Sequence, residues 1–338
     1  MTDRQLRTQH VPEFTLESGE VLRDVRQAYH LDGELNAARD NLVLVIHALT
    51  GSADAAGDWW RGTIGPGLPI DTDRYAVLCT NLLGSCYGTT GPSEPGREAL
   101  PRVTTRDQAR LIHRLIEELG IGSVALVAGG SLGGMVALEW MAEHPSIPRA
   151  AVIFAAPAAH TASAIAWNHI QRQAIAAGGE RGLEIARMIG MMTYRTAEEQ
   201  EIRFARGTEE DGRWSIASYL EHHGRKLRGR FDIGSYVALT HAMDSHDVGR
   251  GRGGIRAALH PLADRLVGVG IPGDLLYGAA DVRAWTNASG AAYREIHSIH
   301  GHDAFLLEPE QAGRILADAL AGAHAPPKEQ DDEHPAGD

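Results

Sequence analysis

Continuous apolar runs alternate along the chain with stretches in which apolar residues recur at helical spacing. The runs have the length of strands, and they are Leu42–Ile46, Tyr75–Cys79, Val124–Ala128, Ala151–Phe154 and Leu266–Ile271. Runs of this kind are typical of strands that are buried on both faces of a sheet. Because helical stretches separate them, the pattern predicts an α/β fold with a mostly parallel central sheet and helices on both faces.

Local patterns also predict where several outer elements begin. Phe14–Gly19 and Val21–His30 alternate imperfectly between polar and apolar residues, which favours a hairpin, and the polar residues 1–12 before it are expected to be loose. Thr105 and Gln108 have the spacing of a capping box, so a helix is expected to begin at Thr105 and to end near Gly120.

A block without convincing strands interrupts the alternating pattern between about residues 158 and 254. Helical stretches are predicted at Ala164–Ala176 and Leu183–Met192, and Thr196 with Glu199 caps a third. We interpret residues 158–254 as an inserted helical lid, and residues 13–157 and 255–324 as a discontinuous core. Residues 325–338 hold three prolines and six charged side chains, which predicts a disordered tail.

Composition narrows the classes of function. The 338 residues include 43% hydrophobic and 22% charged residues, which is ordinary for a globular protein, and the formal net charge is −12. This acidic balance argues against nucleic acid or an anionic membrane surface as a partner. Two cysteines are too few for a disulfide framework, and no run of eighteen apolar residues is present. With a polar beginning that lacks a signal peptide, we expect a cytoplasmic protein.

The main candidate for chemistry is Ser131, at the centre of a G-x-S-x-G motif formed by residues 129–133. An apolar run precedes the motif and a mostly apolar helical stretch follows it, so the serine lies in a strand–turn–helix context. Small neighbours allow the tight turn that exposes such a nucleophile, and the helix N-terminus adds positive potential there. The alternative is a glycine-rich turn with an incidental serine.

A serine nucleophile needs a histidine base and an acid that orients the histidine. In the order Ser, acid, His, the best histidine is His302, on a short turn before a late helix. Asp274 follows the strand that ends at Ile271 more closely than Asp281 does, so Asp274 is preferred, although either aspartate could simply cap a turn.

Other candidates for the site are a metal pair, a second nucleophile and an oxyanion hole. His300 and His302 lack an evident third ligand, so no metal site is predicted. Cys86 lacks the strand–turn–helix context of a nucleophile. The backbone N–H groups of Leu49 and Leu132 are expected to form the oxyanion hole, because they follow an early strand and the nucleophile respectively.

Several long motifs, in order, make the chain resemble the homoserine O-acetyltransferases from about Glu17 to Glu308. They are His47–Gly51, Gly65–Gly67 with Ile70–Thr72, Asn81–Pro92, Gly129–Met135, Ser245–Gly251, Gly270–Tyr277 and Gly301–Leu306. The resemblance implies an α/β-hydrolase core with a helical lid, and a homodimer formed through the lid.

The resemblance also implies acetyl transfer from acetyl-CoA, as co-substrate, to the L-homoserine hydroxyl in methionine biosynthesis, without a bound cofactor. Ser131 matches the family's nucleophile, His302 its base, and Asp274 lies in the stretch that carries its acid. Arg187 matches the arginine for the substrate carboxylate, and Asp303 the acid for its amino group. A salt bridge between lid and core is the alternative role for these last two residues.

The sequence leaves other functions open, and they differ in whether they use Ser131, Asp274 and His302. A homoserine O-succinyltransferase or a serine O-acetyltransferase would use the same triad, and an esterase-type hydrolase would release the acyl group to water. A binding protein without catalysis would not need a serine, an acid and a histidine in this order.

Overall fold

The computed structural model describes residues 4–93 and 100–323. The predicted disordered tail, residues 325–338, lies outside the described residues. In chain order, the strands of the main sheet are β1 (Arg7–Thr15), β2 (Val21–Asp32), β3 (Leu42–Ile46), β6 (Ala76–Thr80), β7 (Val124–Gly130), β8 (Ala151–Phe154), β9 (Leu266–Gly270) and β10 (Ala292–Glu295). The short strands β4 (Ile64–Gly65) and β5 (Ile70–Asp71) form a separate pair.

The eight main strands form one sheet in the order β1-β2-β6-β3-β7-β8-β9-β10. Neighbours from β6 to β10 are parallel, whereas β1 and β2 are antiparallel to each other and β2 is antiparallel to β6. The sheet is therefore mostly parallel, as the apolar runs predict, with an antiparallel hairpin at one edge.

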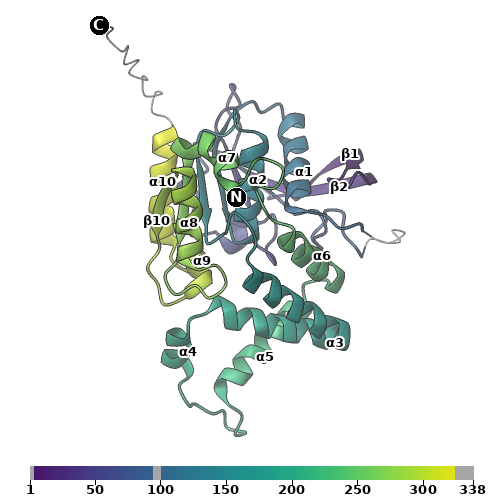
Figure 1. The fold of residues 1–338 in the computed structure, drawn as a ribbon, viewed down its shortest axis with the longest axis vertical. Coiled ribbons are helices and arrows are strands. Elements are labelled where there is room, and N and C mark those ends of the chain that lie inside the picture. Colours follow the sequence, from purple (N-terminus) through teal and green to yellow (C-terminus); the bar gives the residue numbers. More distant parts are fainter. Residues whose placement is uncertain (1–3, 94–99, 324–338) are drawn as a thin grey trace.

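Both faces of the central strands are buried, which explains their continuous apolar sequences. In β3, Leu42, Leu44 and Ile46 belong to one core cluster, whereas Val43 and Val45 belong to the other. Helices α1 (Thr105–Glu118), α2 (Leu132–Glu143) and α8 (Ala279–Ser289) contribute to the first cluster, and α10 (Pro309–Ala323) contributes to the second (Figure 1). Helices thus cover both faces of the sheet.

Of the five α-helices that lie between β8 and β9 in the sequence, four gather at one end of the molecule (Figure 1). They are α3 (Ala162–Tyr194), α4 (Ala197–Phe204), α5 (Ser215–Arg228) and α6 (Ile233–Asp244), followed by the short α7 (Ile255–Leu259). The two stretches predicted from the sequence within α3 form one long element whose helical path breaks at Gly179, where φ is 53°. Within the described residues, no helix is long and apolar enough to cross a membrane.

The structure corrects several predicted boundaries. Strand β1 begins at Arg7, so residues 7–12 are not loose and the core begins before residue 13. The α1 cap is Thr104 with Asp107, one residue earlier than predicted, because these two side chains and backbone N–H groups satisfy each other. The edge strand β10 was not predicted, since its residues are half exposed and polar side chains interrupt its apolar pattern.

Candidate active site

Ser131 lies in a sharp turn between β7 and α2, at the carboxyl end of the central strands. Its φ is 56°, a left-handed conformation that L-residues with side chains rarely adopt. The turn also requires glycine on both sides. A Cβ at Gly129 would collide with the Gly133 carbonyl, and a Cβ at Gly133 with the Ile46 carbonyl. The backbone is therefore that of a nucleophile elbow, the local structure predicted from the G-x-S-x-G motif.

His302 and Asp274 form a buried hydrogen-bonded pair. Nδ1 of His302 lies 2.7 Å from Oδ2 of Asp274, and both side chains are almost fully buried. The other carboxylate oxygen, Oδ1, accepts hydrogen bonds from the backbone N–H groups of Leu276 (2.8 Å) and Tyr277 (3.0 Å). Because both oxygens have fixed partners, the carboxylate holds the orientation of the imidazole ring. Asp281, the alternative acid, lies in the first turn of α8.

The second ring nitrogen of His302, Nε2, takes no part in the hydrogen bonds that hold the ring in place. Nε2 of His302 is buried and has no hydrogen-bond partner within the described residues. His302 and Ser131 line the same cavity. Catalytic hydrogen bonds are often long in a site without substrate, so a base with a free Nε2 beside a serine is compatible with proton transfer between them.

The surroundings of His302 favour its charged form. Burial opposes the charge, but the negative charge and hydrogen bond of Asp274 outweigh this effect, so the pKa of His302 lies above its ordinary value of 6.5. An imidazolium that forms during a reaction would therefore be stabilised by Asp274.

This shift predicts the acid side of the pH–activity profile. His302 must be neutral to accept a proton, and its pKa is raised, so kcat/KM should fall as the pH decreases through a midpoint above 6.5. Measuring kcat/KM between about pH 5 and pH 9 tests this. A midpoint clearly below 6.5 would contradict the assignment of His302 as the base.

The two residues predicted to form the oxyanion hole, Leu49 and Leu132, follow β3 and Ser131 in the structure. Leu132 is the first residue of α2, and the first N–H groups of a helix have no acceptor within it. Leu49 follows β3 and lines the cavity together with Ser131. The role of these two amides in stabilising a tetrahedral oxyanion stays a prediction.

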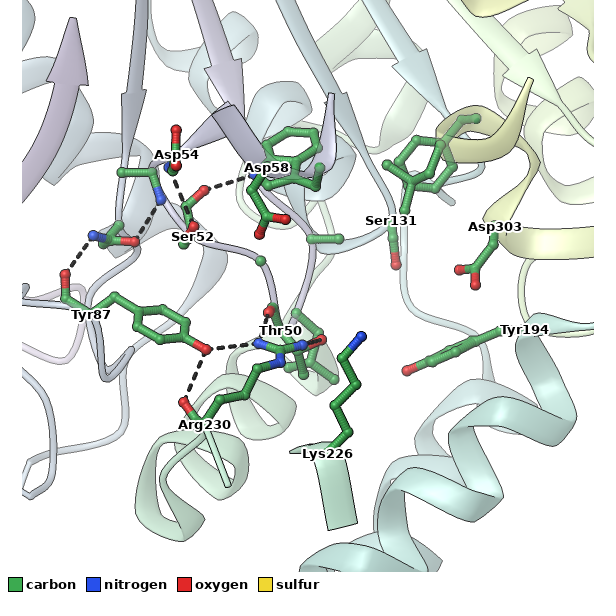
Figure 2. Close-up of a pocket in the computed structure, with 18 of the residues that line it drawn as sticks. Thr50, Ser52, Asp54, Asp58, Tyr87, Ser131, Tyr194, Lys226, Arg230 and Asp303 are labelled. Carbon is green, nitrogen blue, oxygen red and sulfur yellow. Dashed lines mark hydrogen bonds between the residues drawn. The ribbon is translucent and has the colours of Figure 1, made fainter. Parts of the chain in front are cut away.

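A cavity of about 610 Å³ lies between the carboxyl end of the sheet and the helices α3 and α5 (Figure 2). Its wall includes Ser131, His302 and the predicted substrate-binding residues Arg187 and Asp303. Its size lies in the range of sites for small molecules. The tertiary structure therefore brings together, in one cavity, residues that lie far apart in the sequence.

The two predicted substrate-binding residues differ in their contacts. Asp303 forms an ion pair with Arg195 (3.1 Å), which immediately follows α3, so the alternative of a salt bridge between lid and core describes this contact. Arg187 instead lies over the ring of Tyr194, with 5.4 Å between its guanidinium carbon and the ring centroid. No ion pair of its guanidinium is found within the described residues, so this group remains available for an anionic ligand.

Sequence analysis missed several residues around the site. Tyr194 and Tyr277 pack against His302, with ring centroids 5.7 Å and 5.4 Å from the imidazole centroid. Lys226 and Arg230, from the end of α5 and the residues after it, line the cavity. The basic segment 225–230 is visible in the sequence, but nothing in the sequence shows that it faces the serine.

Cys86, the alternative nucleophile, does not line the cavity that contains Ser131. Cys86 contacts the Arg230 carbonyl oxygen at 4.0 Å, and burial raises the pKa of its thiol, which makes it a weaker nucleophile. In the described part of the chain, no three histidine, cysteine or acidic side chains are grouped as metal ligands.

Comparison with known proteins supports the same fold. Residues 41–177 match a family model described as the alpha/beta hydrolase fold. Esterase E22, whose crystal structure is known, has a TM-score of 0.86, covers 94% of this chain and 99% of its own, and is 20% identical, which shows the fold alone. The predicted α/β-hydrolase fold is thereby confirmed.

Closer relatives identify the family. The homoserine O-acetyltransferase of Thermobifida fusca (strain YX) is 43% identical over 344 residues, which cover 90% of this chain and 91% of that protein. The crystal structure of homoserine O-acetyltransferase from Staphylococcus aureus has a TM-score of 0.83 and 32% identity, and covers 98% of each chain. Since this similarity extends over nearly the whole length of the chain, the chain belongs to the homoserine O-acetyltransferase family.

Proposed function

We propose that the protein transfers an acetyl group from acetyl-CoA to the hydroxyl of L-homoserine, a step of methionine biosynthesis. One observation carries this proposal beyond family membership: a serine in a strained turn shares a cavity with a buried histidine–aspartate pair whose outer nitrogen is free. This arrangement is suited to acyl transfer through a serine ester.

Each residue has a defined role in the proposed reaction. His302, oriented by Asp274, accepts the Ser131 proton while the serine oxygen attacks the thioester carbonyl. The N–H groups of Leu49 and Leu132 stabilise the oxyanion. When the carbon–sulfur bond breaks, His302 returns the proton to the departing thiol, and an acetyl-serine remains. His302 then deprotonates the homoserine hydroxyl, which attacks the acetyl carbonyl, and His302 returns this proton to the Ser131 oxygen as the serine ester breaks.

Homoserine is held in this proposal by two side chains of opposite charge. The Arg187 guanidinium binds the carboxylate, since its planar fork matches two carboxylate oxygens. Asp303 binds the amino group while it remains in its ion pair with Arg195. Residues 158–254 act as a lid that limits access of water, because hydrolysis of the acetyl-serine competes with transfer.

Free-thiol release distinguishes this function from the alternatives. Purified protein is incubated with acetyl-CoA or succinyl-CoA, each with L-homoserine, with L-serine or without acceptor. We expect release from acetyl-CoA that depends on homoserine, and O-acetylhomoserine as the product by mass spectrometry.

Each other outcome contradicts a part of the proposal. Preference for succinyl-CoA would change the donor, and preference for serine would change the acceptor. Release without acceptor would indicate a hydrolase, an outcome that the shared fold of esterase E22 makes worth measuring. No release in any combination, and no acyl-Ser131 by intact mass, would favour a binding protein.

We further propose a homodimer that forms through the lid. It acts in the cytoplasm and has no bound cofactor, nucleic-acid partner or membrane partner. Several large apolar side chains on the lid support this interface because they are exposed to solvent; they are Ile165, Ile170, Ile185, Ile202 and Trp214. Size-exclusion chromatography with light scattering tests it, and a monomer at micromolar concentration would contradict it.

A further inference from the structure

Lys226 lies in the last turn of α5 and lines the cavity that contains Ser131. Figure 2 shows its ammonium pointing into the pocket, between Thr50 and Tyr194. No hydrogen bond or ion pair of this ammonium is found within the part of the chain that the structure describes. It is therefore an unpaired positive charge in the proposed substrate cavity.

The neighbouring cations of segment 225–230 have partners. Arg225 is paired with Glu221 at 3.4 Å, and Arg228 with a glutamate of α3 at 2.9 Å. Arg230 donates to the Thr50 carbonyl at 2.8 Å and to a tyrosine hydroxyl at 2.7 Å. The Arg225 pair lies within α5, whereas Arg228 connects α5 to α3 and Arg230 connects the residues after α5 to the core.

The carboxylates of the cavity do not neutralise Lys226. Asp54 is paired with an N-terminal arginine, and Asp303 with Arg195. Asp58, which also lines the cavity, forms no ion pair with Lys226 in the described residues. Arg187, on the adjacent helix, contacts a tyrosine ring rather than a carboxylate. Lys226 and Arg187 thus face the same cavity, and neither has an acidic partner among the residues that the structure describes.

The pKa of the nearby His223 reflects this positive charge. Burial first, and then positive neighbours that include Arg187 and Lys226, lower the pKa of His223 to about 4. His223 is consequently neutral near pH 7 and adds no further charge. The combined field of the two cations favours anionic ligands in the cavity.

We infer that Lys226 binds an anionic group of a substrate, as a second cationic contact beside Arg187. The inference rests on the proposed function, in which both substrates carry such groups: homoserine has a carboxylate, and CoA has phosphates. A lysine ammonium is a compact charge with three rotatable donors, so it can bind either group without the fixed geometry that arginine requires.

Kinetics of Lys226→Met test the inference, with Arg225→Met as the matched control. Both variants remove one positive charge from the same helical turn, but Arg225 does not line the cavity. In Lys226→Met, we expect the KM of one substrate to rise about tenfold, the size expected for the loss of a hydrogen bond between charged groups. Arg225→Met should change either KM less than about twofold, as is usual for an exposed ion pair. Lys226→Arg, which keeps the charge, should recover most of the loss.

Truncated substrates identify the group that is bound. If Lys226 binds phosphate, the KM of acetyl-CoA rises in Lys226→Met but that of S-acetylpantetheine does not. If it binds the carboxylate, the KM of homoserine rises but that of 3-aminopropan-1-ol, which lacks the carboxylate, does not. The inference is overturned if neither KM changes, if truncated substrates are affected equally, or if Arg225→Met has the same effect.

A binding measurement separates this inference from the proposed function. Calorimetric titration of CoA and of homoserine into wild-type protein and Lys226→Met needs no turnover. Weaker binding of one of them to the folded variant supports the anion contact even if wild-type protein releases no thiol. Unchanged binding of both, with active wild-type protein, overturns the anion contact and leaves the proposed acyl transfer intact.

Discussion

Replacing Ser131 with alanine is expected to lower kcat by about 10⁶-fold, because no acyl-enzyme can form without the nucleophile. The Ser131 side chain does not stabilise the fold by capping α2. It stands at the N-terminus of that helix but makes no capping hydrogen bond to it. Alanine at this position should therefore leave the fold intact. Homoserine-dependent thiol release from acetyl-CoA measures the loss.

Three control measurements show whether this loss comes from the missing nucleophile. The thermal midpoint of Ser131→Ala should lie close to that of the wild type, and Ser18→Ala, in the turn before β2, should keep full activity. Intact mass after exposure to acetyl-CoA should show an acetyl adduct in the wild type and none in Ser131→Ala. Turnover retained within a factor of about ten would exclude the acyl-serine mechanism.

Replacing Asp274 with asparagine is expected to lower kcat by about 10⁴-fold. Asparagine keeps the shape of the side chain but removes the charge that stabilises the imidazolium, and its amide can present a donor to Nδ1 and so select the wrong tautomer. The same change should lower the pKa of His302, since the Asp274 charge is what raises it against the effect of burial. The residual activity should therefore persist to lower pH than in the wild type.

Asp281→Asn is the matched control, because the sequence leaves both aspartates as candidates. Asp281 lies in the first turn of α8, away from the imidazole, and its replacement should change kcat by less than about threefold. A large loss in Asp281→Asn together with a small one in Asp274→Asn would reverse the assignment of the acid. Circular dichroism of both variants checks that the loss is not one of folding.

The sequence by itself determined the features that depend on neighbours in the chain. Leu42–Ile46 and Ala151–Phe154 were predicted with the bounds that the structure has, because strands buried on both faces need uninterrupted apolar residues. The elbow at Ser131 was predicted because its turn tolerates only small neighbours. The order of serine, acid and histidine, together with the turn that carries His302 and the strand end that precedes Asp274, then gave the candidates for the other two residues.

Local sequence patterns predicted less where distant segments of the chain determine the environment of a residue. Strand β10 escaped prediction because an edge strand needs little apolar sequence. Glu139 lies in the mostly apolar helix α2, yet its carboxylate is fully buried and paired with Arg106 (3.1 Å) and Arg252 (2.7 Å). Those arginines come from α1 and from the segment that returns from the lid, so the ion pairs exist only in the folded chain.

The tertiary structure alone decided how the site is completed. It brought Asp303 against Arg195, placed Arg187 over Tyr194, and turned the unpaired charge of Lys226 toward the cavity. Each of these contacts depends on how the lid helices pack on the carboxyl end of the sheet, and a sequence pattern carries no direct record of that packing. Spacing along the chain determines which residues can form an element, whereas long-range packing determines which charges meet and which remain free to bind a substrate.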